Sequence, residues 1–172
     1  MIYKNTKKIH ALSVLLGYFI LFLMRGYISN ILMQILLDNK NLVITSNFLL
    51  DICLYIILFV IVVKLVHEFV HGTVIKIFGG TVKYKFKGFF VSAEEISEKE
   101  MNRTEFLIVL TAPLLVISLL TAAFSIWQIK LIFLINIFMS IEDIIKTLYL
   151  LKAKSESKII MKDYGFDIVN LT

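Results

Sequence analysis

Long apolar runs, separated by short polar segments, dominate this chain. The first extends from about Ile9 to Ile31 and is interrupted by Arg25, and the second extends from about Leu42 through Val63. Two more run from about Phe106 to Trp127 and from about Leu131 to Leu151. Each approaches the roughly 20 residues that a helix needs to cross the hydrocarbon core of a bilayer. The pattern predicts a polytopic bundle of about four transmembrane helices.

The hydrophobic pattern changes after the second run, which continues as a helix to Phe78 and stops at Gly79-Gly80. From Thr81 to Lys87 apolar residues alternate with lysines, which is the period of a β-strand. A second strand is expected at Phe89-Phe90-Val91, and the charged tail has strand character at Lys158 to Met161. We expect a mainly α fold with a short strand or hairpin after the second helix, in a single domain spanning residues 1–172.

The composition agrees with this prediction. Hydrophobic residues make up 59% of the 172 residues, charged residues make up 18%, and the mean hydropathy is +0.86. A soluble domain of this length could not bury so much apolar surface, so we expect an integral membrane protein. The single cysteine, Cys53, excludes an intramolecular disulfide and a cysteine-based zinc site.

The basic residues indicate the orientation in the membrane. The formal net charge is +5, but the lysines and arginines cluster between apolar runs, which argues against a nucleic-acid partner. Most of them lie at the N-terminus, in the loop from Lys76 to Arg103 and in the C-terminal tail. Four crossings with both termini in the cytoplasm satisfy this distribution. The first apolar run is not followed by a small-residue cleavage site and is expected to stay as a helix of a multi-pass cell-membrane protein.

Three ionisable residues lie in the motif His67-Glu68-Phe69-Val70-His71, toward the cytoplasmic end of the second helix. Residues four apart share a helix face, so both imidazoles can bind one metal ion. Glu68 projects nearby and can accept a proton from an activated water, as in the H-E-x-x-H signature of zinc peptidases. Ionisable groups at this depth are costly unless they serve a function. The motif predicts a Zn²⁺ site with Glu68 as the catalytic acid/base.

A catalytic zinc needs a third protein ligand. Asp51 lies near the outer end of the second helix, whereas Glu142 and Asp143 lie in the cytoplasmic half of the fourth, level with the motif. His10 is the one further histidine in the sequence. We predict Asp143 as the third ligand, with Glu142 and His10 as the alternatives.

The preference for Asp143 over its neighbour comes from helix periodicity. Asn136, seven residues earlier, and Ser140, three residues earlier, share a helix face with Asp143. They form one polar stripe on an otherwise apolar helix, which is expected to face the interior of the bundle. Asn136 is expected either to assist catalysis or to form an interhelical hydrogen bond.

From about Lys64 to the C-terminus the chain resembles the DUF3267 group of membrane zincin peptidases, which is related to the site-2 protease class of intramembrane metalloproteases. The resemblance rests on His67 to Gly72, Phe78-Gly79-Gly80 with the β segment after it, Ala112-Pro113, and Asn136 to Asp143. It implies that His67 and His71 bind zinc, that Glu68 is the catalytic acid/base and that Asp143 is the third ligand.

The sequence thus predicts a zinc-dependent membrane endopeptidase that hydrolyses peptide bonds of membrane or membrane-proximal substrates. The strand from Val82 to Phe86 is expected to hold an extended substrate segment by strand addition. The alternative is a non-cleaving membrane regulator or immunity-type protein that binds a peptide or partner, although such a protein has no need for Glu68. The substrate, the depth of cleavage, the gating of access and the oligomeric state do not follow from the sequence.

Overall fold

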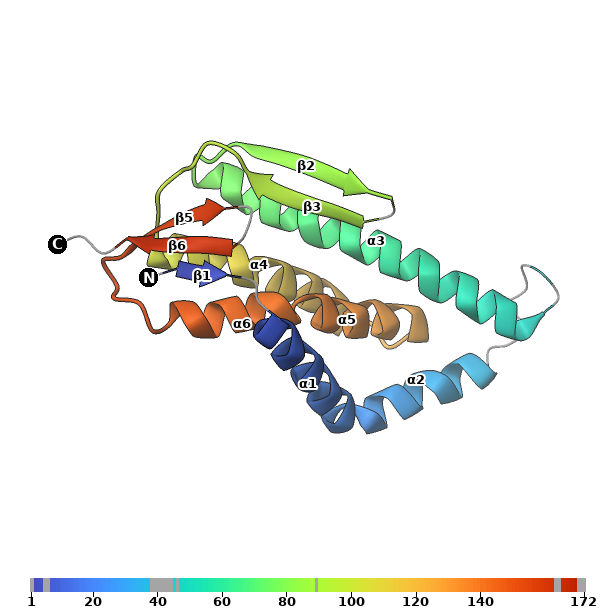
Figure 1. Ribbon diagram of the computed structural model, residues 1–172. Helices are drawn as coiled ribbons and strands as arrows, with labels where there is room; N and C mark the ends of the chain where they lie inside the picture. Colours follow the sequence, from blue (N-terminus) through green and yellow to red (C-terminus); the bar gives the residue numbers. More distant parts are fainter. Residues whose placement is uncertain are drawn as a thin grey trace.

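The computed structural model describes residues 2–4, 7–37, 45, 47–88, 90–162 and 165–169. Over these residues the protein is mainly helical, as predicted, with short antiparallel strands at one end (Figure 1). The helices are α1 (Lys7–Leu23), α2 (Arg25–Leu37), α3 (Phe48–Ile77), α4 (Arg103–Ala122), α5 (Trp127–Met139) and α6 (Ile141–Leu150).

The strands form two antiparallel sheets. They are β1 (Ile2–Lys4), β2 (Val82–Lys87), β3 (Phe90–Glu95), β4 (Met101–Asn102), β5 (Lys158–Lys162) and β6 (Gly165–Val169). β2 and β3 form the predicted hairpin after the second apolar helix, and a second sheet has the order β1-β6-β5-β4. Because β1 pairs with β6, the first and last described strands lie side by side at the same end of the molecule (Figure 1).

Helix α3 carries the H-E-x-x-H motif and has clear ends. The Asn47 side chain accepts a hydrogen bond from the Leu50 N–H (3.2 Å) and caps the N-terminus. At the other end the helix stops at Phe78, and Gly79 has a φ of +82°, which a residue without Cβ adopts at little cost. The helix end predicted at the Gly79-Gly80 pair is therefore confirmed. Of the residues before Phe48 that were expected to be helical, 42–44 and 46 lie outside the described part.

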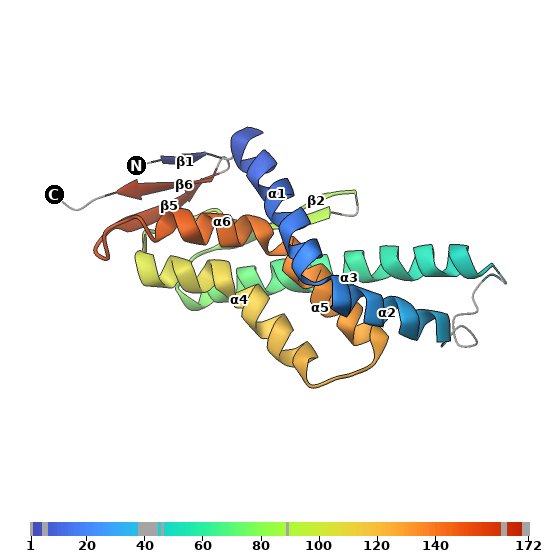
Figure 2. The ribbon, with the colours of Figure 1, turned by 90° about the horizontal axis from the view of Figure 1, so that it is seen from below.

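The first apolar run is not one straight helix. α1 and α2 meet at Met24 with a bend of 68°. The described part of the chain has two candidate membrane spans, or three if this bent pair counts as one span. Arg25 opens α2, and its guanidinium lies 5.3 Å from the centre of the Phe22 ring. The bend lets α1 contact α6 while α2 contacts α5 (Figure 2).

The fourth apolar run is also divided. α3 and α4 are each long and apolar enough to cross a membrane, but the run from 131 to 151 is split at Ser140 into α5 and α6, two shorter helices. The Ser140 hydroxyl donates to the Asn136 carbonyl (2.9 Å), a local bond that competes with regular helical geometry. Together the two helices return the chain from the far end of α4 to the sheet that contains β5 and β6 (Figure 1).

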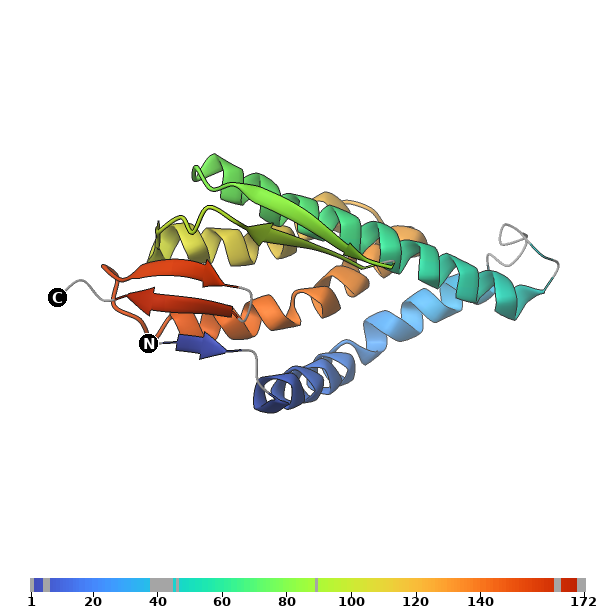
Figure 3. The same ribbon diagram turned by 45° about the horizontal axis from the view of Figure 1, so that its top comes forward.

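The β2–β3 hairpin lies along the C-terminal half of α3 (Figure 3). A glycine makes this close approach feasible, since a Cβ at Gly72 would overlap the Tyr84 hydroxyl oxygen. The larger of the two apolar cores is at this same end, where α3, α4 and α6 meet the four-stranded sheet. The hairpin, the core and the sheet thus surround the last turns of α3, which carry the motif.

Candidate metal centre

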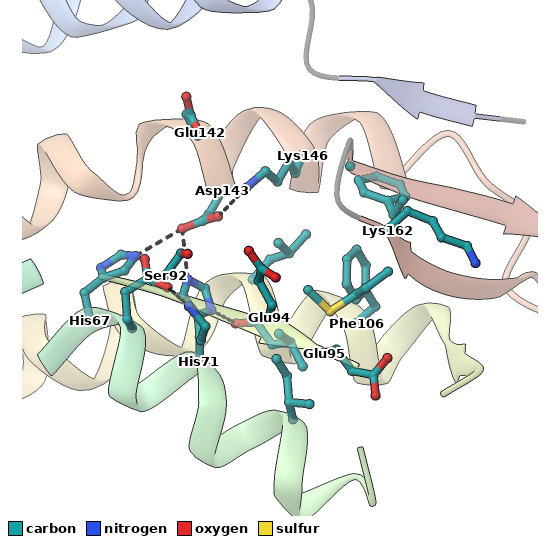
Figure 4. Close-up of a pocket in the computed structure, with 18 of the residues that line it drawn as sticks. His67, His71, Ser92, Glu94, Glu95, Phe106, Glu142, Asp143, Lys146 and Lys162 are labelled. Carbon is teal, nitrogen blue, oxygen red and sulfur yellow. Dashed lines mark hydrogen bonds and ion pairs between the residues drawn. The ribbon is translucent and has the colours of Figure 1, made fainter. Parts of the chain in front are cut away.

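His67 and His71 lie one turn apart on α3 and face Asp143 of α6. The Nε2 atoms of His67 and His71 lie 3.2 Å and 3.1 Å from the same Asp143 oxygen, Oδ2 (Figure 4). All three side chains are buried, and their potential ligand atoms lie within 4.8 Å of one another. The structure therefore brings together the three residues that the sequence predicted as zinc ligands.

The opposite nitrogen of each imidazole faces a hydrogen-bond acceptor. His67 Nδ1 lies 3.2 Å from Asn136 Oδ1, and His71 Nδ1 lies 2.8 Å from the Val109 carbonyl oxygen. Each Nδ1 must carry a proton to make these bonds, which leaves Nε2 with a lone pair in the neutral ring. Two such lone pairs then converge on a carboxylate oxygen of Asp143. A cation bound between these three acceptor atoms would offset the repulsion among their lone pairs.

The donor set fits zinc. Zinc bonds of about 2.0–2.1 Å in a tetrahedral arrangement place neighbouring donor atoms roughly 3.3 Å apart, close to the separations of the histidine nitrogens from Asp143. Two imidazoles and one carboxylate leave a fourth position for water or substrate, as catalytic zinc sites require. The outer hydrogen bonds of the histidines are the kind that orient zinc ligands in proteins.

The alternative third ligands do not reach the centre. Glu142 points away from the two histidines (Figure 4), because it precedes Asp143 on α6 and projects from another face. His10 is exposed on α1. Asp51 is buried near the start of α3, where it accepts hydrogen bonds from the Thr45 N–H (2.9 Å) and hydroxyl (2.7 Å). Of the four candidates, Asp143 has the required geometry.

Glu68 is held beside the centre by two partners. One carboxylate oxygen lies 2.5 Å from Lys64 Nζ, one turn earlier on α3, and the other accepts the Ala93 N–H of β3 at 2.8 Å. The residue is only 8% exposed. A carboxylate oxygen accepts more than one hydrogen bond, so both oxygens keep lone pairs that can take a proton.

A cavity of about 330 Å³ opens onto these side chains. Its walls come from α3, β3, α4, α6 and the four-stranded sheet, including Tyr3 of β1. Burial raises the pKa of the Tyr3 hydroxyl, and the charge of Lys146 opposes this rise only in part. With its pKa raised, Tyr3 remains a neutral hydrogen-bond donor at the cavity wall.

Lys146 also lines the cavity. Its Nζ binds the second oxygen of Asp143 at 3.1 Å.

Several contributors to the site were not found in the sequence. The pair of Lys64 and Glu68 at i and i+4 was visible as a charge pattern, but nothing in the sequence connected it to the site. The Ala93 N–H and the Val109 carbonyl are backbone groups, which no pattern of side chains in the sequence singles out. Tyr3 comes from a strand of three residues that no periodicity could reveal.

The fold and the site define the class: a mainly helical protein with membrane-spanning candidates and the ligand set of a metallopeptidase. The chain belongs to the DUF3267 family, described as "Putative zincin peptidase", whose family model matches residues 58–158. Among curated proteins and among solved structures, none matches the chain. Membership of the family confirms the resemblance to DUF3267 and indicates a zinc-dependent peptidase. The relation to site-2 proteases stays a prediction.

Proposed function

We propose that this protein is a zinc-dependent endopeptidase of the membrane, with His67, His71 and Asp143 as zinc ligands and Glu68 as the catalytic acid/base. The observation that carries the proposal is the convergence of three acceptor atoms beside a held glutamate. Membership of the zincin peptidase family supports it independently.

Zinc held by these ligands supplies a Lewis acid that polarises a carbonyl group and activates water at neutral pH. Glu68 accepts the proton of the attacking water and delivers it to the leaving amine nitrogen as the peptide bond breaks. Lys64 and the Ala93 N–H fix the direction of the Glu68 carboxylate throughout. Exclusion of bulk water by the buried ligands strengthens these electrostatic interactions.

Substrate binding along a strand edge involves β3 rather than β2. The sequence favoured the strand from Val82 to Phe86, but the cavity is lined by residues 92–95 of β3. Because the Ala93 N–H donates to Glu68, it points away from β2, and alternation points the N–H groups of Val91 and Glu95 the same way. We propose that this edge holds an extended substrate segment by strand addition.

The site lies where a membrane span along α3 would end. A span of about 20 residues that starts at Phe48 reaches His67, and the four-stranded sheet lies beyond that point, while the β2–β3 hairpin runs alongside α3 there (Figure 1). We propose cleavage at the membrane boundary, in segments of membrane proteins or in membrane-proximal peptides. We also propose that both termini lie on the cytoplasmic side: the pairing of β1 with β6 supports a common side for both, and the distribution of lysines supports the cytoplasm.

The test is hydrolysis by protein reconstituted in lipid vesicles. The probes are labelled β-casein, an unfolded soluble chain, and a single-span model peptide with an unfolded segment beside the membrane. We expect the wild type to cleave the model peptide near the bilayer and Glu68→Gln to cleave neither probe while it retains zinc. Glu142→Gln, which changes a cavity carboxylate that points away from the ligands, is the matched control and is expected to cleave normally. Zinc binding without hydrolysis of either probe would favour the non-cleaving regulator.

A further inference from the structure

A backbone carbonyl of α4 lacks its usual helical donor because of the only proline in the sequence. In an α-helix the carbonyl of each residue accepts the N–H of the residue four positions later. Pro113 lies within α4, four residues after Val109, and has no N–H. The Val109 carbonyl is therefore released from the helical hydrogen-bond pattern, and α4 is visibly bent in Figure 2.

His71 uses this released carbonyl. Its Nδ1 lies 2.8 Å from the Val109 oxygen, and both residues are buried. A buried ring N–H needs an acceptor, and the bond fixes both the tautomer and the orientation of the imidazole. As a result, Nε2 of His71 faces Asp143 Oδ2.

The same turn of α4 also orients the other histidine, through one intermediate. Asn136 Nδ2 lies 3.4 Å from the carbonyl oxygens of Pro113 and Leu114, and Asn136 is fully buried. These contacts direct the amide oxygen toward His67 Nδ1. Both imidazoles are thus oriented from a single turn of α4.

We propose that Pro113 is a positioning residue of the metal centre, because its missing N–H reserves the Val109 carbonyl for His71. The inference rests on the proposed function, since it concerns the same metal ligands. With an N–H restored at position 113, the helix would compete with the imidazole for the carbonyl. His71 would then be held less firmly, and zinc affinity would fall by about 10- to 100-fold, the usual cost of losing an outer-shell partner.

Two replacements of Pro113 separate the effect of the missing N–H from the effect of the proline ring. Pro113→Ala restores the N–H, whereas lactic acid in place of Pro113 has the same methyl side chain with an ester oxygen and no N–H. Zinc affinity is measured on the full chain in detergent by chelator competition, and the ligand field is followed by Co²⁺ absorption. We expect Pro113→Ala to bind about 10- to 100-fold more weakly with an altered Co²⁺ spectrum, and the lactic acid protein to match the wild type. Metal-free Pro113→Ala should unfold at the wild-type temperature or above it, because alanine favours the helix.

Two results would overturn the inference while leaving the proposed function intact. Wild-type affinity in both replacements would show that the N–H does not affect His71. Equal weakening in both would show that the shape of the ring matters and the missing N–H does not. A folded wild type that binds no zinc would instead overturn the proposed function together with the inference.

Discussion

The two ends of α3 each bury a carboxylate, but in different surroundings. At the N-terminal end Asp51 is 1% exposed and accepts hydrogen bonds from the backbone and hydroxyl of Thr45. At the other end Asp143 of α6 is 7% exposed and meets His67, His71 and Lys146. In the first arrangement the Thr45 donors satisfy the Asp51 carboxylate, and the positive N-terminal end of the helix dipole also stabilises its charge. The second pairs one carboxylate oxygen with Lys146 and sets the other between two imidazole nitrogens, where a metal ion can bind.

The two ends of α3 also differ in how far the rest of the protein buries them. Six of the seven buried residues of α3 lie between Val63 and Ile75, and the seventh is Asp51 near the N-terminal end. The exposed part of α3 therefore offers apolar side chains to lipid. The site end is enclosed by α4, α6 and the hairpin. The carboxylate at the enclosed end shares one oxygen between two imidazoles, whereas Asp51 at the other end meets the donors of Thr45.

Among the residues that hold the ligands or Glu68 in place, a large effect on zinc affinity is expected at Asn136. Asn136→Ala removes the acceptor of His67 Nδ1, so zinc affinity should fall by about 10- to 100-fold. The measurement is chelator competition in detergent. Asn30→Ala, which removes an exposed asparagine bound to Lys130, is the control and should bind zinc normally. Unchanged affinity in Asn136→Ala would mean that its contact with His67 is only structural.

An effect of similar size, on the cleavage rate instead of zinc affinity, is expected at Lys64, which orients Glu68 without touching the ligands. Loss of a hydrogen bond to a charged group costs about 1.5–3 kcal/mol, so Lys64→Met should lower the rate of model-peptide cleavage by at least about tenfold. Zinc content should stay at the wild-type level, and Lys64→Arg should recover part of the rate. A Lys64→Met protein as active as the wild type would remove Lys64 from the site.

Substrate binding along β3 should respond more weakly. Val91→Pro removes an N–H that points away from β2, and loss of one such hydrogen bond to a substrate should raise the KM for the model peptide by about 3- to 10-fold. Val91→Ala, which shortens the side chain but keeps the N–H, is the control. If Val91→Pro and Val91→Ala raise KM equally, the effect comes from the side chain and the strand-addition proposal fails.

The far end of α3 should influence stability and leave the metal unaffected. Asp51→Asn weakens the bonds to Thr45, and the free energy of unfolding should fall by about 1–2 kcal/mol. Zinc content and cleavage rate should match the wild type. Denaturant unfolding in detergent gives the first quantity and metal analysis the second. Loss of zinc in Asp51→Asn would contradict the division between the two ends.

Periodicity in the sequence was enough to predict the helical class, the hairpin and the face of the fourth run that meets the motif. Asn136 and Asp143, seven residues apart, both reach His67, although Ser140 divides the run between them. The stripe was readable because only a few polar residues interrupt an apolar run. It survived the break because Ser140 itself has a near-helical backbone conformation, with φ of −80° and ψ of −3°.

The remaining features depend on long-range contacts or on backbone groups. The bend at Met24 lies beside Arg25 and Gly26, but neither residue alone specifies a bend or its angle, which depends on the contacts of α1 with α6 and of α2 with α5. The pairing of β1 with β6 joins two short segments from opposite ends of the chain. Pro113 could be read as a helix irregularity, but the imidazole that uses the released carbonyl is supplied by a different helix.

The most direct measurement is the zinc content per chain of detergent-purified protein, for the wild type, His71→Ala and Asp143→Asn. Glu142→Gln and His10→Ala serve as controls, because both residues were alternative ligands and neither is placed at the centre. We expect about one zinc in the wild type and both controls, and loss or strong weakening in His71→Ala and Asp143→Asn. Zinc retained in Asp143→Asn but lost in a control, or no zinc in folded wild type supplied with the metal, would contradict the assigned site.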